Sequence, residues 1–183
     1  AAIMYFAPNI INESIQSVEN AFLGAVLVGV INCLFTFVAI NNIEKFGRRK
    51  LLLIGVSGAF VSLSGVSFLF AMESKFVIIP LLMYVASFAF SFGPIVWVII
   101  SEIFPTQIRG LAVSLGSFSL MLTGFVITLT NPILIETVMP SGTFLIYAIL
   151  VLPAIWFIWK FIPETKGKSL EEIEKYWRTK YKQ

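Results

Sequence analysis

The sequence predicts an all-α integral membrane protein, and three observations support this fold class. Of the 183 residues, 58% are hydrophobic and only 13% are charged, and the mean hydropathy is +0.92; soluble domains have about 25% charged residues. Five runs of 22 to 26 residues contain no charged residue. Such a run, as a helix, crosses a hydrocarbon core of about 30 Å. The runs lack the alternating polarity of barrel strands, so we expect helices.

The five predicted transmembrane helices lie in order along the chain, at residues 20–43, 51–72, 76–101, 110–135 and 137–159. Residues 1–11 form an apolar segment that is too short to cross the membrane. We expect this segment to be the end of a sixth helix that begins before Ala1, so that the chain is a fragment. The membrane domain then covers residues 1–162.

The C-terminal segment, residues 163–183, has a different composition. Ser169 is a helix-capping residue, and Leu170, Ile173 and Trp177 recur at a helical spacing that places them on one face. We expect a short amphipathic helix on the cytoplasmic side of the bundle.

The 13 basic residues are distributed very unevenly between the two sides of the membrane. Twelve of them follow odd-numbered spans, and only Lys75 falls on the other side. Because basic residues concentrate in cytoplasmic loops, the sequence predicts that loops after odd-numbered spans and the C-terminus are cytoplasmic. We expect a multi-pass protein of the plasma membrane, with the lipid bilayer as a partner.

Several classes of function are disfavoured by what the chain lacks. The sequence contains no His and no Asp, its single cysteine is Cys33, and no charged residue lies within a predicted span. A catalytic centre, a metal site, a cofactor and a disulfide are therefore not expected. A nucleic-acid partner is not expected either, because the chain has too few polar residues for a basic solvated face.

The candidate binding residues inside the spans are neutral. Asn32 lies in the middle of the first span, where its amide either bonds a neighbouring helix or faces an aqueous cavity. Gly93 and Pro94 are predicted to kink or break the third span, and Trp97 follows them. Broken helices line the binding sites of transporters. Trp97 either packs in the bundle or stacks on the apolar face of a sugar.

Charged residues gather at the predicted cytoplasmic helix ends. Carboxylates and guanidiniums placed there can pair and hold neighbouring helices in register. They are either solvated pairs worth about 0–1 kcal/mol each or contacts that form in one conformation and bias an equilibrium. The set comprises Glu44, Lys45, Arg48, Arg49, Glu102, Arg109 and Glu164.

Four motifs occur in a recognisable order. Residues 44–49 have the pattern acidic-x-x-Gly-Arg-Arg, residues 93–97 read Gly-Pro-x-x-Trp, residues 101–110 follow as the next loop, and residues 163–167 read Pro-Glu-Thr-Lys-Gly. With them the chain resembles the C-terminal half of the sugar porter family in the major facilitator superfamily. The resemblance implies that residues 1–162 hold the end of helix seven through helix twelve.

The resemblance also implies transport of a monosaccharide by alternating access, with the missing N-terminal half as a partner. By position it implies that Asn32, Tyr5, Phe88 and Trp97 line the sugar site and that Phe6 stands at a gate position. The sequence departs from the family pattern at a few site positions, which makes the implied site less polar: Ala1, Ala89, Leu120 and Met121.

Two alternatives stay open. The first is a porter for another small polar solute, such as a polyol or an organic anion, although an anion would favour Arg or Lys within a span. The second is a nutrient sensor with a porter fold, although such proteins usually carry a long cytoplasmic tail, whereas residues 163–183 are a short one.

Overall fold

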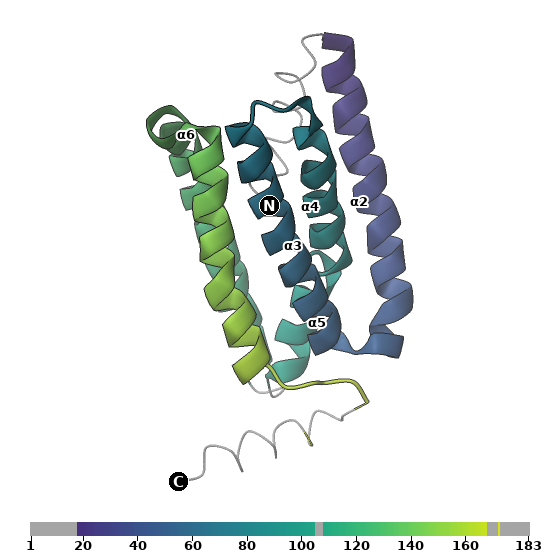
Figure 1. The fold of residues 1–183 in the computed structure, drawn as a ribbon. Coiled ribbons are helices and arrows are strands. Elements are labelled where there is room, and N and C mark those ends of the chain that lie inside the picture. The colour runs from purple at the N-terminus through teal and green to yellow at the C-terminus, as the bar shows by residue number, and fades with distance from the viewer. Residues whose placement is uncertain (1–17, 105–107, 168–171, 173–183) are drawn as a thin grey trace.

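The computed structural model describes residues 18–104, 108–167 and 172, and Figure 1 shows that the described chain is a bundle of helices. The predicted all-α fold is confirmed. Four helical stretches among these residues are long and apolar enough to cross a membrane. The elements are α2 (Val18–Phe46), α3 (Arg48–Ala71), a short 3-10 turn η1 (Lys75–Val77), α4 (Ile78–Phe90), α5 (Pro94–Ile103) and α6 (Arg109–Phe161).

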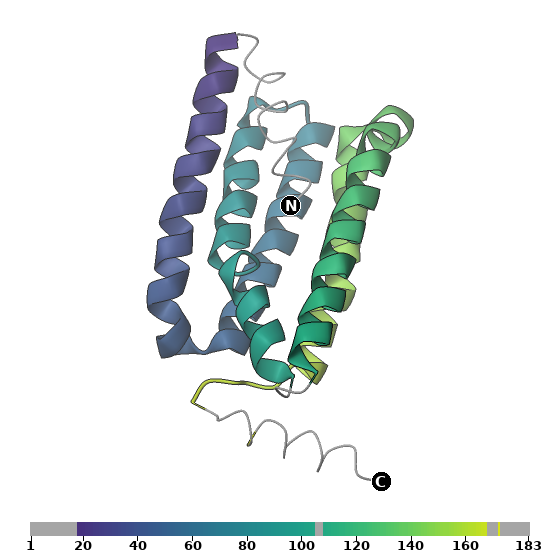
Figure 2. The ribbon, with the colours of Figure 1, turned by 180° about the vertical axis from the view of Figure 1, so that it is seen from behind.

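The long helix α6 is two helices in space. Met139 leaves the helical conformation, with φ 62° and ψ 162°, and Pro140 follows it. A residue before proline is disfavoured in the α region, and the chain reverses there, so that residues 109–138 and 140–161 run as antiparallel arms (Figures 1 and 2). The five predicted spans are therefore α2, α3, α4 together with α5, and the two arms of α6.

Helix α3 occupies the centre of the bundle and contributes to both hydrophobic clusters. In one cluster Leu63 packs with Leu81 of α4 and Phe144 of α6. In the other, Leu51 packs with Ile95 of α5 and with Ile158 near the end of α6. Because lipid is as apolar as these side chains, the close fit of the helices stabilises the bundle more than removal from water does.

Small residues allow α3 and α4 to approach closely. A Cβ atom added to Gly58 would lie 2.5 Å from the Ser87 hydroxyl oxygen, and one added to Gly55 would overlap the Ser91 side chain. Ser87 lies on the face of α4 that meets α3, and Ser91, directly after the end of α4, lies against Gly55 of α3. Glycine and serine at such spacing are typical of helix contacts within membranes.

Two predicted features lie outside the described residues. These are the end of a helix at residues 1–11 and, apart from residue 172, the amphipathic helix around residues 169–177. The described chain ends its last long helix at Phe161, and residues 162–167 continue as an extended segment beneath the bundle (Figure 1).

Candidate functional site

The third span is interrupted in the middle. Helix α4 ends at Phe90 and α5 begins at Pro94, as a proline at the first position of a helix requires no N–H partner. The Phe88 carbonyl accepts hydrogen bonds from the Ser91 N–H at 3.3 Å and the Gly93 N–H at 3.1 Å. The interruption places Trp97 in the first turn of a new helix within the third span.

The neutral candidate residues come from three neighbouring elements. Trp97 of α5 is 43% exposed although it lies within a span. Phe88 of α4 is half-buried and stacks between Tyr84 at 6.4 Å and Phe92 at 5.9 Å, measured between ring centroids. Asn32 of α2 is half-buried, and its backbone carbonyl accepts a hydrogen bond from the Thr36 hydroxyl, one helical turn further on. Helix α2, which carries Asn32, packs against α4 and α5, which carry Phe88 and Trp97.

The positions that depart from the family pattern differ in exposure. Ala89 is buried against the bundle, whereas Leu120 and Met121 are 43% and 68% exposed on the first arm of α6. The surface of α6 around Leu120 and Met121 is therefore apolar. The other predicted site positions, Tyr5 and Phe6, lie outside the described residues, as does Ala1.

At the opposite end of the described spans from Glu73, charged side chains form a connected cluster. Arg48 at the start of α3 pairs with Glu102 of α5 through Nη2 and Oε1 at 3.1 Å. The other Glu102 oxygen accepts the Thr165 hydroxyl at 2.7 Å, and Thr165 is buried. Within the described ranges this is the one ion pair. We call Arg48, Glu102, Glu164 and Thr165 the charge cluster.

Among the described residues, Glu164 binds backbone N–H groups, including the first of α3. Its Oε1 accepts the backbone N–H of Arg48 at 2.9 Å and that of Lys166 at 3.2 Å. A carboxylate at a helix N-terminus satisfies a free N–H group and complements the helix dipole. Gly47 makes room for it: its φ is 87°, and an added Cβ would lie 2.6 Å from a Glu164 oxygen.

The segment 163–167 thereby ties three helices together. Besides the contacts of Glu164 and Thr165, the Lys166 ammonium donates to the backbone carbonyl of Lys45 at 2.7 Å, at the end of α2. These contacts join residues up to 121 positions apart in the chain. The segment crosses beneath the ends of α2, α3 and α5 (Figure 1).

The remaining predicted charges lie at the same end but outside these contacts. Glu44 and the Lys45 side chain are exposed at the end of α2. The Arg49 guanidinium donates to the backbone carbonyl of Trp159. Arg109 is half-buried at the start of α6, and its Nε and Nη2 atoms have no hydrogen-bond partner among the described residues.

Three contacts were not anticipated from the sequence. The first is the hydrogen bond from Thr165 to Glu102, and the second is the close approach of Glu164 to Gly47. Thr165 and Gly47 belong to two of the four sequence motifs, but a motif does not say which atoms meet. The third contact lies inside the membrane: the Tyr147 hydroxyl donates to the side-chain oxygen of Asn131 at 2.9 Å, and both residues are buried. The sequence signal for this contact is Asn131, an asparagine within a span and beside Pro132, because an amide in lipid needs a hydrogen-bond partner.

Comparison with known proteins decides the family. The model of the family described as "Sugar (and other) transporter" matches residues 1–177. The chain belongs to this family. The resemblance to sugar porters that the four motifs predicted is thus confirmed, and the match covers the described helices and both groups of candidate residues.

Members of the sugar transporter family with known names match nearly the whole chain. The D-xylose-proton symporter of Escherichia coli K12 is 36% identical over 98% of the chain, and the glucose facilitated diffusion protein of Zymomonas mobilis is 32% identical over 97%. A solved structure of the proton:xylose symporter XylE bound to 6-bromo-6-deoxy-D-glucose superposes with a TM-score of 0.87 at 37% identity, over 96% of the chain.

The chain spans 38% to 39% of the length of these relatives and 38% of the solved chain. The similarity in structure confirms the helical arrangement of this part of the fold. The matched part of the fold holds the five predicted spans.

Proposed function

We propose that these residues form the C-terminal half of a membrane transporter that moves a monosaccharide by alternating access, and not an enzyme. The observation that carries the proposal is Trp97. In a chain of the sugar transporter family, its indole is 43% exposed in the first turn after a helix break within a span. Transporters place their binding sites at such interrupted helices near the middle of the membrane.

The proposed recognition uses aromatic faces and neutral hydrogen bonds. The Trp97 ring offers an apolar face to the C–H face of a sugar and an N–H to one of its hydroxyls. Asn32 supplies an amide that donates and accepts, and Phe88 is held within a row of stacked rings. Tyr5 and Phe6 are proposed to complete this wall. Because these groups are uncharged, the proposed substrate is a neutral polyhydroxylated molecule.

The proposed gating element is the charge cluster, together with Glu44, Lys45, Arg49 and Arg109. Alternating access requires two states of similar free energy and contacts that differ between them. The cluster joins the α2–α3 turn, the end of α5 and the segment after α6 through partly buried contacts. Separation of these helix ends would break the contacts, so the cluster favours the state in which they are together.

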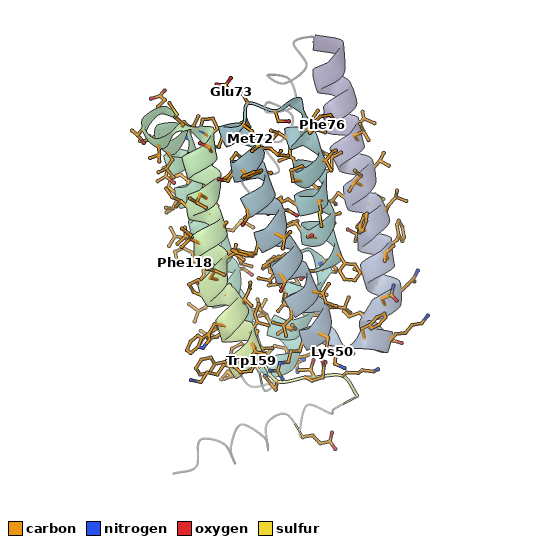
Figure 3. All side chains as sticks on the ribbon, in the orientation of Figure 1. Lys50, Met72, Glu73, Phe76, Phe118 and Trp159 are labelled. Atoms are coloured by element: carbon orange, nitrogen blue, oxygen red, sulfur yellow. The ribbon has the colours of Figure 1, made fainter. Side chains whose placement is uncertain are left out.

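The topology follows from the same proposal. Lys50 and Trp159 lie at one end of the bundle and Glu73 at the other (Figure 3), and the end rich in basic residues is proposed to face the cytoplasm. Residues 1–162 are then the membrane half-domain in the plasma membrane, and residues 163–183 are cytoplasmic. The other wall of the sugar site comes from the N-terminal half of the transporter, and the lipid bilayer surrounds both halves.

The test is sugar uptake by proteoliposomes that contain the full-length protein, with D-xylose and D-glucose as first substrates. We expect Trp97→Ala to weaken sugar affinity about tenfold, equivalent to about 1.4 kcal/mol of lost stacking and hydrogen bonding, and Trp97→Phe to weaken it less. Phe68→Ala, which removes a ring 59% exposed on α3, is the control and should leave affinity unchanged.

Three outcomes would contradict the proposal. Unchanged affinity in Trp97→Ala would remove this residue from the site. Uptake of a polyol or an organic anion without uptake of any monosaccharide would make the protein a porter of another solute. Sugar binding without uptake would favour a sensor.

A further inference from the structure

The basic residues at the cytoplasmic end outnumber the carboxylates that pair with them. Seven lysines and arginines lie there in the described chain, and within those ranges only Arg48 forms an ion pair with a carboxylate. Arg49 and Lys166 donate to backbone carbonyls. Lys50 and Lys160 are exposed. This end of the bundle therefore carries positive charge that the described carboxylates do not neutralise.

Two of these lysines end apolar stripes on neighbouring helices. On the second arm of α6, exposed side chains recur at helical spacing and lead to Lys160: Leu145, Ile149, Leu152 and Trp156. On α3 the exposed Phe68, Val61 and Ile54 lead in the same way to Lys50. Positions spaced by three, four or seven residues share one face of a helix. Each stripe is thus an apolar surface that suits an acyl chain, and each stripe ends at a lysine.

A hydrogen bond joins the two lysine-bearing helix ends. The Arg49 guanidinium donates to the Trp159 carbonyl, which links the first turn of α3 to the last turn of α6. Lys50 and Lys160 are the next residues along the chain from these two partners. Figure 3 shows Lys50 and Trp159 at the same end of the bundle, where α3 and α6 pack together.

Aromatic rings hold the Lys160 ammonium in place. It lies 4.8 Å from the centroid of the Trp156 ring and 5.7 Å from that of Phe161. Phe161 in turn makes an edge contact with Trp156 at 5.7 Å and stacks with Phe157 at 5.1 Å. A cation over an aromatic face is stabilised without a carboxylate, and its remaining N–H groups stay available to an anion.

We propose that Arg49, Lys50 and Lys160 bind the phosphate of an anionic phospholipid from the cytoplasmic leaflet. The acyl chains lie along the stripes of α3 and α6, and Trp156 and Trp159, which are 53% and 63% exposed, lie at the headgroup level. Basic residues near the surface attract anionic lipids, and basic sites between helices bind their headgroups. The apolar stripes favour a lipid over a soluble phosphate, because only a lipid covers both parts of the surface.

The experiment measures binding of phosphatidylglycerol to the full-length protein in detergent, through the rise in melting temperature during lipid titration. Phosphatidylcholine tests the acyl chains without net charge, and glycerol phosphate tests the phosphate without acyl chains. We expect stabilisation by phosphatidylglycerol alone. Lys160→Gln and Lys50→Gln should each raise its dissociation constant about fivefold, as expected for one cation near a membrane surface.

The matched control is Lys45→Gln, which removes the same charge at the same end but on α2; it should change the dissociation constant less than twofold. A second variant, Trp156→Leu, removes the ring beneath Lys160 while keeping every charge, and should weaken binding about two- to fivefold. Equal weakening by Lys45→Gln would show a diffuse charge effect and overturn the proposal. Equal stabilisation by phosphatidylcholine or by glycerol phosphate would also overturn it.

Discussion

The membrane interior of this bundle and the charged end that we propose to be cytoplasmic are held together in different ways. In the interior, α3 and α4 meet through Gly55, Gly58 and the serines opposite them, with no charged group involved. At the cytoplasmic end, the contacts are an ion pair, a carboxylate at a helix N-terminus and a hydroxyl on Glu102. Steric fit in lipid has no competing solvent, whereas charged contacts at the water boundary exchange with water. The interior is thus suited to be permanent and the cytoplasmic end to be reversible.

The interior also contains a buried hydrogen bond between two neutral side chains, Tyr147 and Asn131, which lie on the two arms of α6. It differs from the cytoplasmic contacts because neither group finds water if the bond breaks, so separation leaves a polar atom unsatisfied in the core. Hydrogen bonds between membrane helices nevertheless contribute modestly on average, since partners are also found in the unfolded state within lipid. We therefore rank this pair below the glycine contacts in its effect on stability.

The largest expected effect comes from filling the α3–α4 contact. Gly55→Val places side-chain atoms where Ser91 now lies and within 3.0 Å of the Ser87 carbonyl oxygen, and such overpacking should destabilise the bundle by about 3 kcal/mol or more. The measurement is the melting temperature of the full-length protein in detergent.

Gly29→Val is its control, because a Cβ at Gly29 would meet no atom within 4 Å. The same substitution there should change stability by about 1 kcal/mol or less, through helix propensity alone. Equal losses for the two variants would mean that the close contact between α3 and α4 contributes nothing specific.

A smaller loss of stability is expected at Gly47, where a substitution disturbs the charged end of the bundle and leaves the contacts of the interior unchanged. Gly47→Ala puts a Cβ on a residue with φ 87° and ψ 154° and against the Glu164 carboxylate. This backbone conformation is adopted almost only by glycine, and it costs another residue about 1–3 kcal/mol. Glu164 should leave α3, and a reporter cysteine on the cytoplasmic side should react faster with a soluble maleimide.

The comparison variant for this second prediction is Gly110→Ala at the start of α6, where an added Cβ meets nothing within 4 Å. It should leave both the melting temperature and the labelling rate unchanged. If Gly47→Ala lowers the melting temperature without changing the labelling rate, the cluster stabilises the fold and does not bias a conformational equilibrium.

The smallest expected effect is at the neutral pair in α6. Tyr147→Phe removes the hydroxyl that donates to Asn131 and should destabilise the protein by about 0.6 kcal/mol, and by no more than about 1.7 kcal/mol. A double-mutant cycle with Asn131→Leu isolates the contribution of the pair. A coupling energy of zero would show that the two side chains contribute independently, in which case the hydrogen bond has no part in joining the arms.

Much of the fold was predictable because lipid allows few kinds of spanning structure, and the sequence shows which residues span. Runs without charge mark the spans, and Gly93 and Pro94 stand where α4 ends and α5 begins. Less of the candidate site could be predicted. The charged residues at helix ends were expected to interact, yet no pattern in the sequence assigns Arg48 to Glu102 rather than to Glu164. Several pairings of these arginines and glutamates would neutralise the same charges.

What the amino-acid sequence specifies here is which residues belong in lipid, where a helix is interrupted and on which side the positive charge gathers, because each depends on local composition and on the chemistry of proline. What required the tertiary structure is the set of atoms that meet across long separations. Glu164 reaches the first turn of α3 across 116 positions, and Thr165 reaches Glu102 across 63. These contacts exist because packing of α3, α5 and α6 brings their ends together, and packing depends on shape in three dimensions, which no single segment encodes.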